Sequence, residues 1–404
     1  MFRLEILHMN ISVILPTKDL VLSVAKVLDA LTQQTLKPKE VIIIDSSKDS
    51  QIQMLAQEFN EKLNIVYMYF TNPLYPGEAR NRGVCLAENE LIAFIDSKTI
   101  PSSTWLEKSA HQIINKQCEV IYGSTLYKAN TQFQKILQAS IYGKKPISTA
   151  PGSLLTKAIA RKIGKFAEGV RASEDQEWRN RIQDLEIKTH TPAEHNLEYH
   201  SISKTLTEEL KRNFIYQLHT AKTNAQTNSK IFIFGIFITL LTLLVPSWNI
   251  LVGFKLSFFF IPNITKIYLA CMVVMFAILL IFYQRKIKHI LLRFILVAIG
   301  IASFYIVYRW NGPISRSLDF IVYFPYVTRI YILFLICSGF IYRALISPSR
   351  KGVEIMSLFP FWWIKIGVIC CLIDLIKVPG YIVGALLALN RMFIQSLKSS
   401  SFTR

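Results

Sequence analysis

A short stretch of the chain, FIDSKTIP at 94–101, places an aspartate and a lysine where an apolar run ends. Asp96 follows the run directly and Lys98 stands two residues later. Two carboxylates at this spacing could hold a divalent cation, whereas a lysine ammonium has three donors and no acceptor and cannot ligate a metal. The stretch is therefore either a ligand-binding turn with a cation in place of its second acid, or a strand that simply ends in Asp-Ser-Lys.

The segments around this turn predict an α/β sheet. β-branched runs followed by breakers predict strands, and apolar residues at helical spacing predict helices between them. Strands are expected at 11–15, 41–44, 64–69, 91–95 and 119–122, and helices at 20–35 and 78–87. Strands that alternate with helices form a mostly parallel sheet in three layers, with the ligand site at the carboxyl ends of the strands.

That rule selects a set of residues that should rim one crevice. Pro16 and Thr17 follow the first strand, Asp45 follows the second, and the Asp96–Lys98 turn follows a later one. Each has an ordinary alternative, because Asp and Ser commonly cap the helices that follow strands. For Asp45 taken alone, both interpretations stand.

Four motifs occur in one order along the first 220 residues or so, and together they resemble the cytoplasmic inverting glycosyltransferases of family 2. PGEARNRGVCLAENELIAFID is similar to the family pattern of a glycine, Ala-Arg-Asn-x-Gly on a helix, and a strand running into an Asp-x-Asp turn. SVILPTKD and VIIIDSSKD look like its nucleotide-binding turns, and FAEGVRASEDQEWRNRI looks like its acceptor-side segment. The resemblance implies a GT-A-like, Rossmann-like nucleotide-sugar-binding domain, and many members carry membrane helices after it.

The resemblance also implies roles for individual residues. Asp175 would be the general base, with Glu174 as the alternative, because a carboxylate at a helix N-terminus is held ionised by the helix dipole. An ordinary helix cap is the competing interpretation of this pair. The donor-binding residues would be Pro16, Thr17, Asp45, Gly77, Arg80, Asp96 and Lys98, and the acceptor side would hold Trp178 and Arg181.

The metal site that the family implies is placed in doubt by Lys98. In the family the last acid of the turn binds a divalent cation, magnesium or manganese, which neutralises the donor diphosphate. One hypothesis is that the Lys98 ammonium takes over this electrostatic role in a metal-independent site, since lysine binds phosphate as a point charge. The other keeps a cation on Asp96 and the donor phosphates, with His200 as a further ligand. Arg80 either faces phosphate or braces the turn by pairing with an acid.

The second half of the chain has the composition of a membrane domain. The protein has a formal net charge of +19, of which +14 falls in residues 231–404, with 17 Lys and Arg against three acids. These cations flank apolar runs, which favours membrane lipid over nucleic acid as the partner. Runs at 231–248, 267–283, 290–308 and 330–346 approach the length of a span. A fifth, 358–389, is interrupted by charges and by Pro379-Gly380, so it could instead form two interfacial helices, which leaves four or five apolar helices.

Domain boundaries and location follow from these patterns. We expect a glycosyltransferase domain at 1–200, an amphipathic interfacial helix or linker at 201–230 that could equally pack on the domain, and a membrane domain at 231–404. The first ten residues are too short and polar for a signal peptide, and QRKIKHILLR and SPSRK place positive charge on the same side as the N-terminal domain. The expected location is an inner membrane of bacterial type, with the catalytic domain in the cytoplasm. The six cysteines predict neither disulfides nor a zinc site.

The leading hypothesis is a membrane-bound glycosyltransferase that moves a sugar from a nucleotide sugar to a lipid-linked or glycan acceptor, with inversion, in cell-envelope polysaccharide assembly. A polyprenyl-phosphate glycosyl synthase is the close rival, and its anionic acceptor would need no general base. A degenerate, non-catalytic transferase that scaffolds a membrane assembly is the alternative from another class. A transporter is disfavoured because the apolar segments hold few charges to line a polar path.

Overall fold

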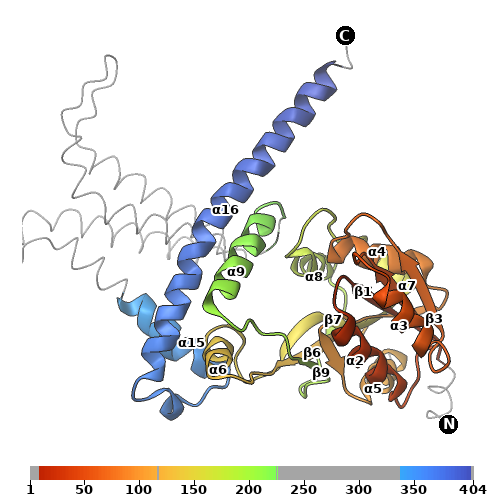
Figure 1. The fold of residues 1–404 in the computed structure, drawn as a ribbon, viewed down its shortest axis with the longest axis horizontal. Coiled ribbons are helices and arrows are strands. Elements are labelled where there is room, and N and C mark those ends of the chain that lie inside the picture. The colour runs from red at the N-terminus through yellow and green to blue at the C-terminus, as the bar shows by residue number, and fades with distance from the viewer. Residues whose placement is uncertain (1–8, 116–117, 224, 226–336, 402–404) are drawn as a thin grey trace, which may run out of the picture. The chain divides into compact units, whose positions relative to one another are not determined.

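The protein is described by a computed structural model over residues 9–115, 118–223, 225 and 337–401. Its centre is a nine-stranded mixed sheet with strand order β3-β2-β1-β4-β7-β6-β9-β5, in which β8 pairs with β6 (Figure 1). The strands are β1 Ile11–Thr17, β2 Glu40–Asp45, β3 Ile65–Tyr69, β4 Leu91–Phe94, β5 Thr99–Pro101, β6 Val120–Tyr127, β7 Ile147–Thr156, β8 Thr189–His190 and β9 Leu197–Tyr199.

Helices cover both faces of this sheet and connect its strands. They are α2 Val21–Thr32, α3 Gln51–Phe59, α4 Pro76–Leu86, α5 Trp105–Ile114, α6 Gln132–Leu137, the π-helical turn η1 Gln138–Tyr142, α7 Lys157–Ile163, α8 Glu174–Asp184 and α9 Leu206–Thr220. Side chains alternate across a strand, so Val13 and Leu15 of β1 join one buried cluster while Ile14 joins the other. The first cluster packs under α2, α3 and α5, and the second under α4, α7 and α8.

The predicted fold class is confirmed, with one addition from the structure. β1, β2, β3 and β4 pair in parallel, as the alternation of strands and helices predicts. β7 then lies antiparallel between β4 and β6. No strand is predicted from the sequence over β7, so its insertion at the centre of the sheet is a tertiary outcome.

The glycines of the Gly-x-x-Arg-Asn-x-Gly motif let α4 approach its neighbours closely. A Cβ added at Gly83 would lie 2.3 Å from Cγ2 of Ile14 on β1, and one at Gly77 would lie 2.5 Å from the carbonyl oxygen of Ala167. Both distances are far below van der Waals contact, so larger residues would push α4 away. The two glycines thus set the position of the helix that carries Arg80.

The C-terminal segment is helical and packs with the N-terminal domain in one compact unit that comprises Met1–Gln226 and Arg343–Arg404. It holds the turns η4 Tyr342–Ile346 and η5 Ile355–Leu358, the short α15 Ser347–Arg350, and α16 Trp362–Ser401. Pro379 lies inside α16 and does not end it. From Trp362 onward the apolar segment at 358–389 is therefore one continuous helix, not the two interfacial helices of the alternative. In the part of the chain that the structure describes, Trp362–Ala388 is the one helix long and apolar enough to cross a bilayer.

The other predicted spans lie largely beyond this description. The runs at 231–248, 267–283 and 290–308 fall outside the described residues, as does the first part of 330–346. Their number and placement therefore stay predictions.

The helices α9 and α16 lie side by side (Figure 1). Two glycines one turn apart on α16 make the contact: a Cβ at Gly380 would lie 2.6 Å from the carbonyl oxygen of Phe214, and one at Gly384 would lie 2.3 Å from that of Leu218. Small residues spaced by four are the usual means of bringing two helix backbones together in an apolar setting. Thus α9 packs against α16, and the interfacial role expected for residues 201–230 stays a prediction.

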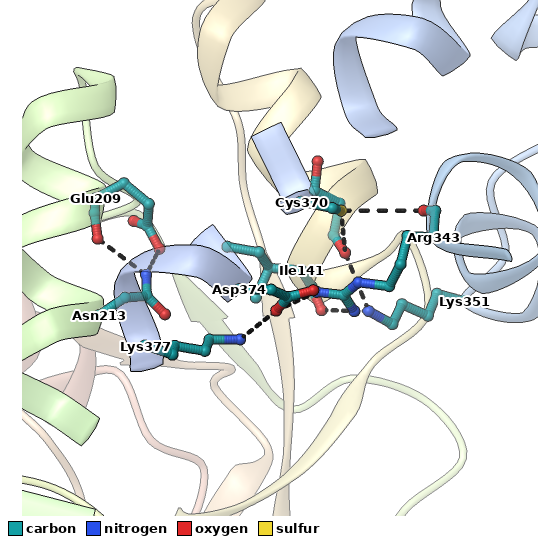
Figure 2. Close-up of polar contacts among 9 residues, drawn as sticks. Ile141, Glu209, Asn213, Arg343, Lys351, Cys370, Asp374 and Lys377 are labelled. Carbon is teal, nitrogen blue, oxygen red and sulfur yellow. Dashed lines mark hydrogen bonds and ion pairs between the residues drawn. The ribbon is translucent and has the colours of Figure 1, made fainter. Parts of the chain in front are cut away.

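Polar contacts join α16 to η4 and join the residue after α15 to η1 (Figure 2). The Asp374 carboxylate, which is buried, pairs with Arg343 at 2.9 Å and with Lys377 at 3.0 Å. The Lys351 ammonium donates to the carbonyl oxygens of Ser140 and Ile141, at 3.2 and 2.7 Å, near the C-terminal end of η1. Cations at a helix C-terminus complement its partial negative charge, so Lys351 holds η1 against the C-terminal segment.

The glycine contact predicts a specific effect on stability. Gly384→Ala should lower the thermal unfolding temperature of the full-length protein in detergent, because overpacking a close contact costs about 1–3 kcal/mol. Leu386→Ala is the control, since this side chain on the same helix is 60% exposed. An unchanged melting temperature for Gly384→Ala would show that α9 and α16 do not pack through this contact in solution.

Candidate active site

The site is organised by Arg80, whose buried guanidinium pairs with two acids from different elements. Nη2 lies 2.7 Å from Oδ1 of Asp96, in the turn after β4, and Nη1 lies 3.0 Å from Oε1 of Glu174, the first residue of α8. Only 2% of the Arg80 side chain is exposed, and its charge lies over the Phe166 ring at 5.3 Å. Of the two sequence hypotheses for Arg80, the structure shows the brace.

Glu174 has an altered protonation equilibrium in this setting. The pKa of its carboxyl is raised to about 7: burial is the largest cause, the charge of Arg80 opposes it, and the nearby charge of Asp175 adds to it. Removing a carboxylate from water disfavours its charged form, and here this effect exceeds the attraction of one guanidinium. Glu174 is thus a buried group that takes up a proton near neutral pH.

Asp175 occupies the first turn of α8 and is only partly buried. Its Oδ1 accepts a hydrogen bond from the backbone N–H of Gln176 at 2.7 Å. The helix N-terminus favours negative charge at this position. Asp175 and Glu174 are neighbours with different environments, since Glu174 is sealed against Arg80 while Asp175 remains accessible.

Two of the predicted donor-side residues, Thr17 and Asp45, lie next to each other at the carboxyl ends of β1 and β2, where they pair in register. The Asp45 side chain is already hydrogen-bonded within the protein. The Asp45 carboxylate accepts from the Ser47 backbone and hydroxyl at 2.9 and 2.6 Å, and from the Tyr67 hydroxyl at 2.8 Å. By contrast, Oγ1 of Thr17 is buried without a hydrogen-bond partner in the described part of the chain, and Pro16 beside it is partly exposed.

The Asp96–Lys98 turn does not fit a divalent-cation site. One oxygen of Asp96 is already held by Arg80, and the last position of the turn is a lysine. The second predicted ligand, His200, pairs with Glu198 at 3.1 Å. Within residues 9–115, 118–223, 225 and 337–401, no group of three or more His, Cys, Asp or Glu side chains is arranged to hold a metal. The described residues around this turn thus supply few ligands for the cation that the family pattern implies.

The two residues predicted on the acceptor side serve the interior of the domain. Trp178 is 1% exposed and stacks on Phe166 with ring centroids 4.8 Å apart. Arg181 pairs with Glu177 at 2.8 Å and donates to the carbonyl oxygen of Ile163 at 2.6 Å. As placed here, both hold α8 in position, and direct contact of either with an acceptor stays a prediction.

A cluster of tyrosines with Arg212 closes the other end of the site, and sequence reasoning did not single it out. The Tyr127 and Tyr142 rings stack with centroids 4.0 Å apart and planes at 11°, and Tyr199 lies 4.9 Å from Tyr127. Arg212 of α9 donates to the Tyr142 hydroxyl and pairs with the buried Glu209 at 2.8 Å. Burial raises the pKa of Tyr127, and the charges of Asp175 and Asp96 add to this effect.

This cluster could not be predicted from the sequence, because it depends on strand pairing that leaves no local pattern. Tyr127 and Tyr199 become neighbours because β6 and β9 pair in parallel. Tyr142 reaches them from the end of η1, a helix that the sequence did not predict. Arg212 falls in the segment 201–230, for which the sequence predicts only an amphipathic helix or linker.

The geometry therefore defines an α/β domain with paired carboxylates and a basic, tyrosine-rich flank at the carboxyl end of its sheet. Residues 12–169 match the family model described as Glycosyl transferase family 2. These residues are a glycosyltransferase family 2 domain, which confirms the family that the motifs predict.

Relatives with described activities resemble part of the chain. Glycosyltransferase AglE of Haloferax volcanii is 23% identical over 189 residues, which are 43% of this chain and 61% of that protein. The poly(ribitol-phosphate) beta-N-acetylglucosaminyltransferase TarS of Staphylococcus aureus is 30% identical over 117 residues, 28% of this chain and 20% of that protein. The chain thus matches less than two thirds of the length of either relative.

Among solved structures, the similar ones include S. aureus TarS 1-349 in complex with UDP-GlcNAc. It has a TM-score of 0.42 and 16% sequence identity, over 74% of this chain and 92% of that one.

The protonation of Glu174 predicts a dependence of stability on pH. Because the pKa in the folded state is raised to about 7, the folded protein holds this proton more tightly than the unfolded chain. The contribution is complete below about pH 4.5 and is lost as the pH rises through 7, by a few kcal/mol at most. Denaturant unfolding of the full-length protein in detergent from pH 5 to 8 should show this loss, and Glu174→Gln should remove it. Glu90→Gln, at an exposed position, should keep the native slope, and an identical slope in all three proteins would contradict the assignment.

Proposed function

We propose that the protein is a nucleotide-sugar-dependent glycosyltransferase that acts on a lipid-linked or glycan acceptor with inversion, as in cell-envelope polysaccharide assembly. The observation that carries the proposal is the Arg80 bridge, which joins the turn of Asp96 to the helix that begins with Glu174 and Asp175. The family match over residues 12–169 supports the class of reaction.

In this mechanism Asp175 is the general base. Its carboxylate accepts the proton of an acceptor hydroxyl as that oxygen attacks the anomeric carbon of the donor sugar. The bond from the anomeric carbon to the diphosphate oxygen breaks on the opposite side, and the nucleoside diphosphate leaves with the electron pair. Attack opposite to the leaving group inverts the configuration, and the proton remains on Asp175.

The donor would lie along the carboxyl ends of β1, β2 and β4. Thr17 offers a buried hydroxyl that has no hydrogen-bond partner within the described residues, and a nucleoside would supply one, because unpaired buried polar groups are costly. Asp45 would act by keeping Ser47 and the β2 end in place, given its hydrogen bonds within the protein. Asp96 would approach the donor sugar or ribose with the carboxylate oxygen that Arg80 leaves free.

Membrane association is proposed from α16. Large apolar side chains on this helix are exposed, namely Ile364, Val368, Leu372, Leu375, Ile382, Val383, Leu386 and Leu387. An apolar face of this extent is typical of a surface that meets lipid or another apolar partner. Because α9 carries Arg212 and packs on α16, a lipid-linked acceptor held along α16 would have its polar end near the carboxylates. The corresponding location is an inner membrane with the catalytic domain in the cytoplasm.

The function is tested directly with the full-length protein in detergent and a panel of UDP-, GDP-, CDP- and dTDP-sugars. Each donor is incubated with bacterial lipid extract as the source of acceptor, and release of nucleotide and transfer of labelled sugar are both measured. One donor should give transfer. The absence of nucleotide release and of sugar transfer across the panel would favour the scaffold alternative.

Substitution of the proposed general base, Asp175, should distinguish transfer to a hydroxyl acceptor from the reaction of a polyprenyl-phosphate glycosyl synthase. Asp175→Asn should lower the rate of transfer by roughly 10²–10⁴-fold with donor binding retained, because general-base catalysis contributes about that factor. Asp184→Asn, at the exposed end of the same helix, is the matched control and should be fully active. Full transfer by Asp175→Asn would point to a polyprenyl-phosphate acceptor, whose phosphate is already an anion.

A further inference from the structure

Lys98 is a partly buried cation whose positive charge is not paired with an acid among the described residues. It lies in a tight turn in which the Thr99 N–H donates to the Asp96 carbonyl oxygen at 3.0 Å. Its ammonium has no hydrogen-bonded or ion-paired partner within the residues that the structure describes. A cation at that depth is costly unless an anion completes its surroundings.

A series of strand pairs and tyrosine contacts links the neighbour of Lys98 to Arg212 of α9. Thr99 pairs with Tyr199 across β5 and β9, and Tyr199 pairs with Tyr127 across β9 and β6. Tyr127 stacks on Tyr142, whose hydroxyl accepts a hydrogen bond from Arg212. Lys98 and Arg212 thus lie at the same end of the sheet, on either side of the tyrosines.

Arg171 approaches the same place from the segment before α8. Two residues after it, the Ser173 hydroxyl is 2.6 Å from the Thr220 hydroxyl of α9, which anchors this segment next to the helix that carries Arg212. Arg171 is exposed. Burial lowers the pKa of Lys98, and the charges of Arg171 and Arg212 lower it further, in keeping with the placement of both guanidinium groups on the Lys98 side of the site.

The acids nearby leave much of this positive charge uncompensated. Asp96 is bound by Arg80, and Glu209 is held by Arg212 and by Asn213, whose amide donates to Oε1 at 2.7 Å (Figure 2). Glu208 is exposed at the first turn of α9, where its Oε2 accepts from the Lys204 N–H at 2.8 Å. Glu208 and Asp96 do offset part of the charge on Lys98, but neither forms an ion pair with it.

We infer that Lys98, Arg171 and Arg212 form a binding site for the diphosphate of the donor and take the place of a divalent cation in stabilising the leaving group. This inference rests on the proposed function. As the anomeric carbon–oxygen bond breaks, negative charge grows on the terminal phosphate of the nucleoside diphosphate, and fixed cations aimed at that oxygen stabilise the transition state. Lys98 and Arg171 supply two positive charges, the same as a magnesium ion, and Arg212 contributes a guanidinium suited to bidentate phosphate contact.

The site is tested by nucleotide binding, which needs neither acceptor nor turnover. Isothermal titration of the full-length protein in detergent compares UDP, GDP, CDP and dTDP with the corresponding monophosphates, in excess EDTA and in excess magnesium or manganese. In EDTA the preferred diphosphate should bind at least about tenfold more tightly than its monophosphate, a difference of about 1.4 kcal/mol. Added metal should change this ratio little.

Substitutions test whether the three cations cause the preference for diphosphate over monophosphate. Lys98→Met should reduce the diphosphate-to-monophosphate ratio to near one, Lys98→Arg should restore much of it, and the exposed Arg171→Met should lower it without affecting the melting temperature. Arg212→Met is secondary because Arg212 also holds Glu209. Lys108→Met, at an exposed position on α5, is the matched control and should leave the ratio unchanged.

The outcomes separate this inference from the proposed function. Diphosphate binding that requires metal and is unchanged in Lys98→Met would overturn the cation site, while sugar transfer by the same protein would leave the proposed function intact. A chain that binds no nucleotide under any condition would overturn both.

Discussion

The buried pairing of Arg80 with Asp96 and Glu174 is the constraint on which the rest of the site depends. A guanidinium that is almost completely removed from water must have its charge matched, and breaking such a pair costs about 3–5 kcal/mol because one charge is left alone. Since the three residues come from α4, the turn after β4 and the start of α8, this requirement locks that turn to the helix with the carboxylate pair. It also explains why Glu174 and Asp175 differ, with one sealed against the guanidinium and the other left accessible to a substrate.

The packing of α4 makes that pairing possible. Gly83 lets the helix approach Ile14 of β1, and Asn81 donates to the Phe166 carbonyl oxygen at 3.0 Å and accepts from the Phe166 N–H at 2.8 Å. The segment before α8 is thereby held next to α4, which brings Glu174 within reach of Arg80. A motif that resembles a ligand-binding signature thus acts largely through the protein's own architecture.

The C-terminal helix is part of the same structure and not an appendage to it. Ile369 and Ile373 of α16 belong to a buried cluster against which Tyr127, Tyr142 and Tyr199 pack, and Lys351 holds the turn that ends in Tyr142. Any force on α16, from lipid or from a partner, would reach the tyrosine cluster through direct contact, because close-packed interiors transmit displacement. The apolar helix and the tyrosine cluster are therefore mechanically connected.

The sequence by itself determined the α/β class, the strands β1, β2, β3, β4 and β6, the family, and the position of the carboxylates at strand and helix ends. Periodicity and local motifs act over a few residues, so they carry this information directly. Tertiary structure decided that Arg80 braces the site, that Trp178 and Arg181 pack inside the domain, and that Asp45 is held by Ser47 and Tyr67. It also brought Tyr127, Tyr142, Tyr199 and Arg212 together, because β7 and β9 join the sheet by long-range pairing that depends on the whole fold and leaves no local signal.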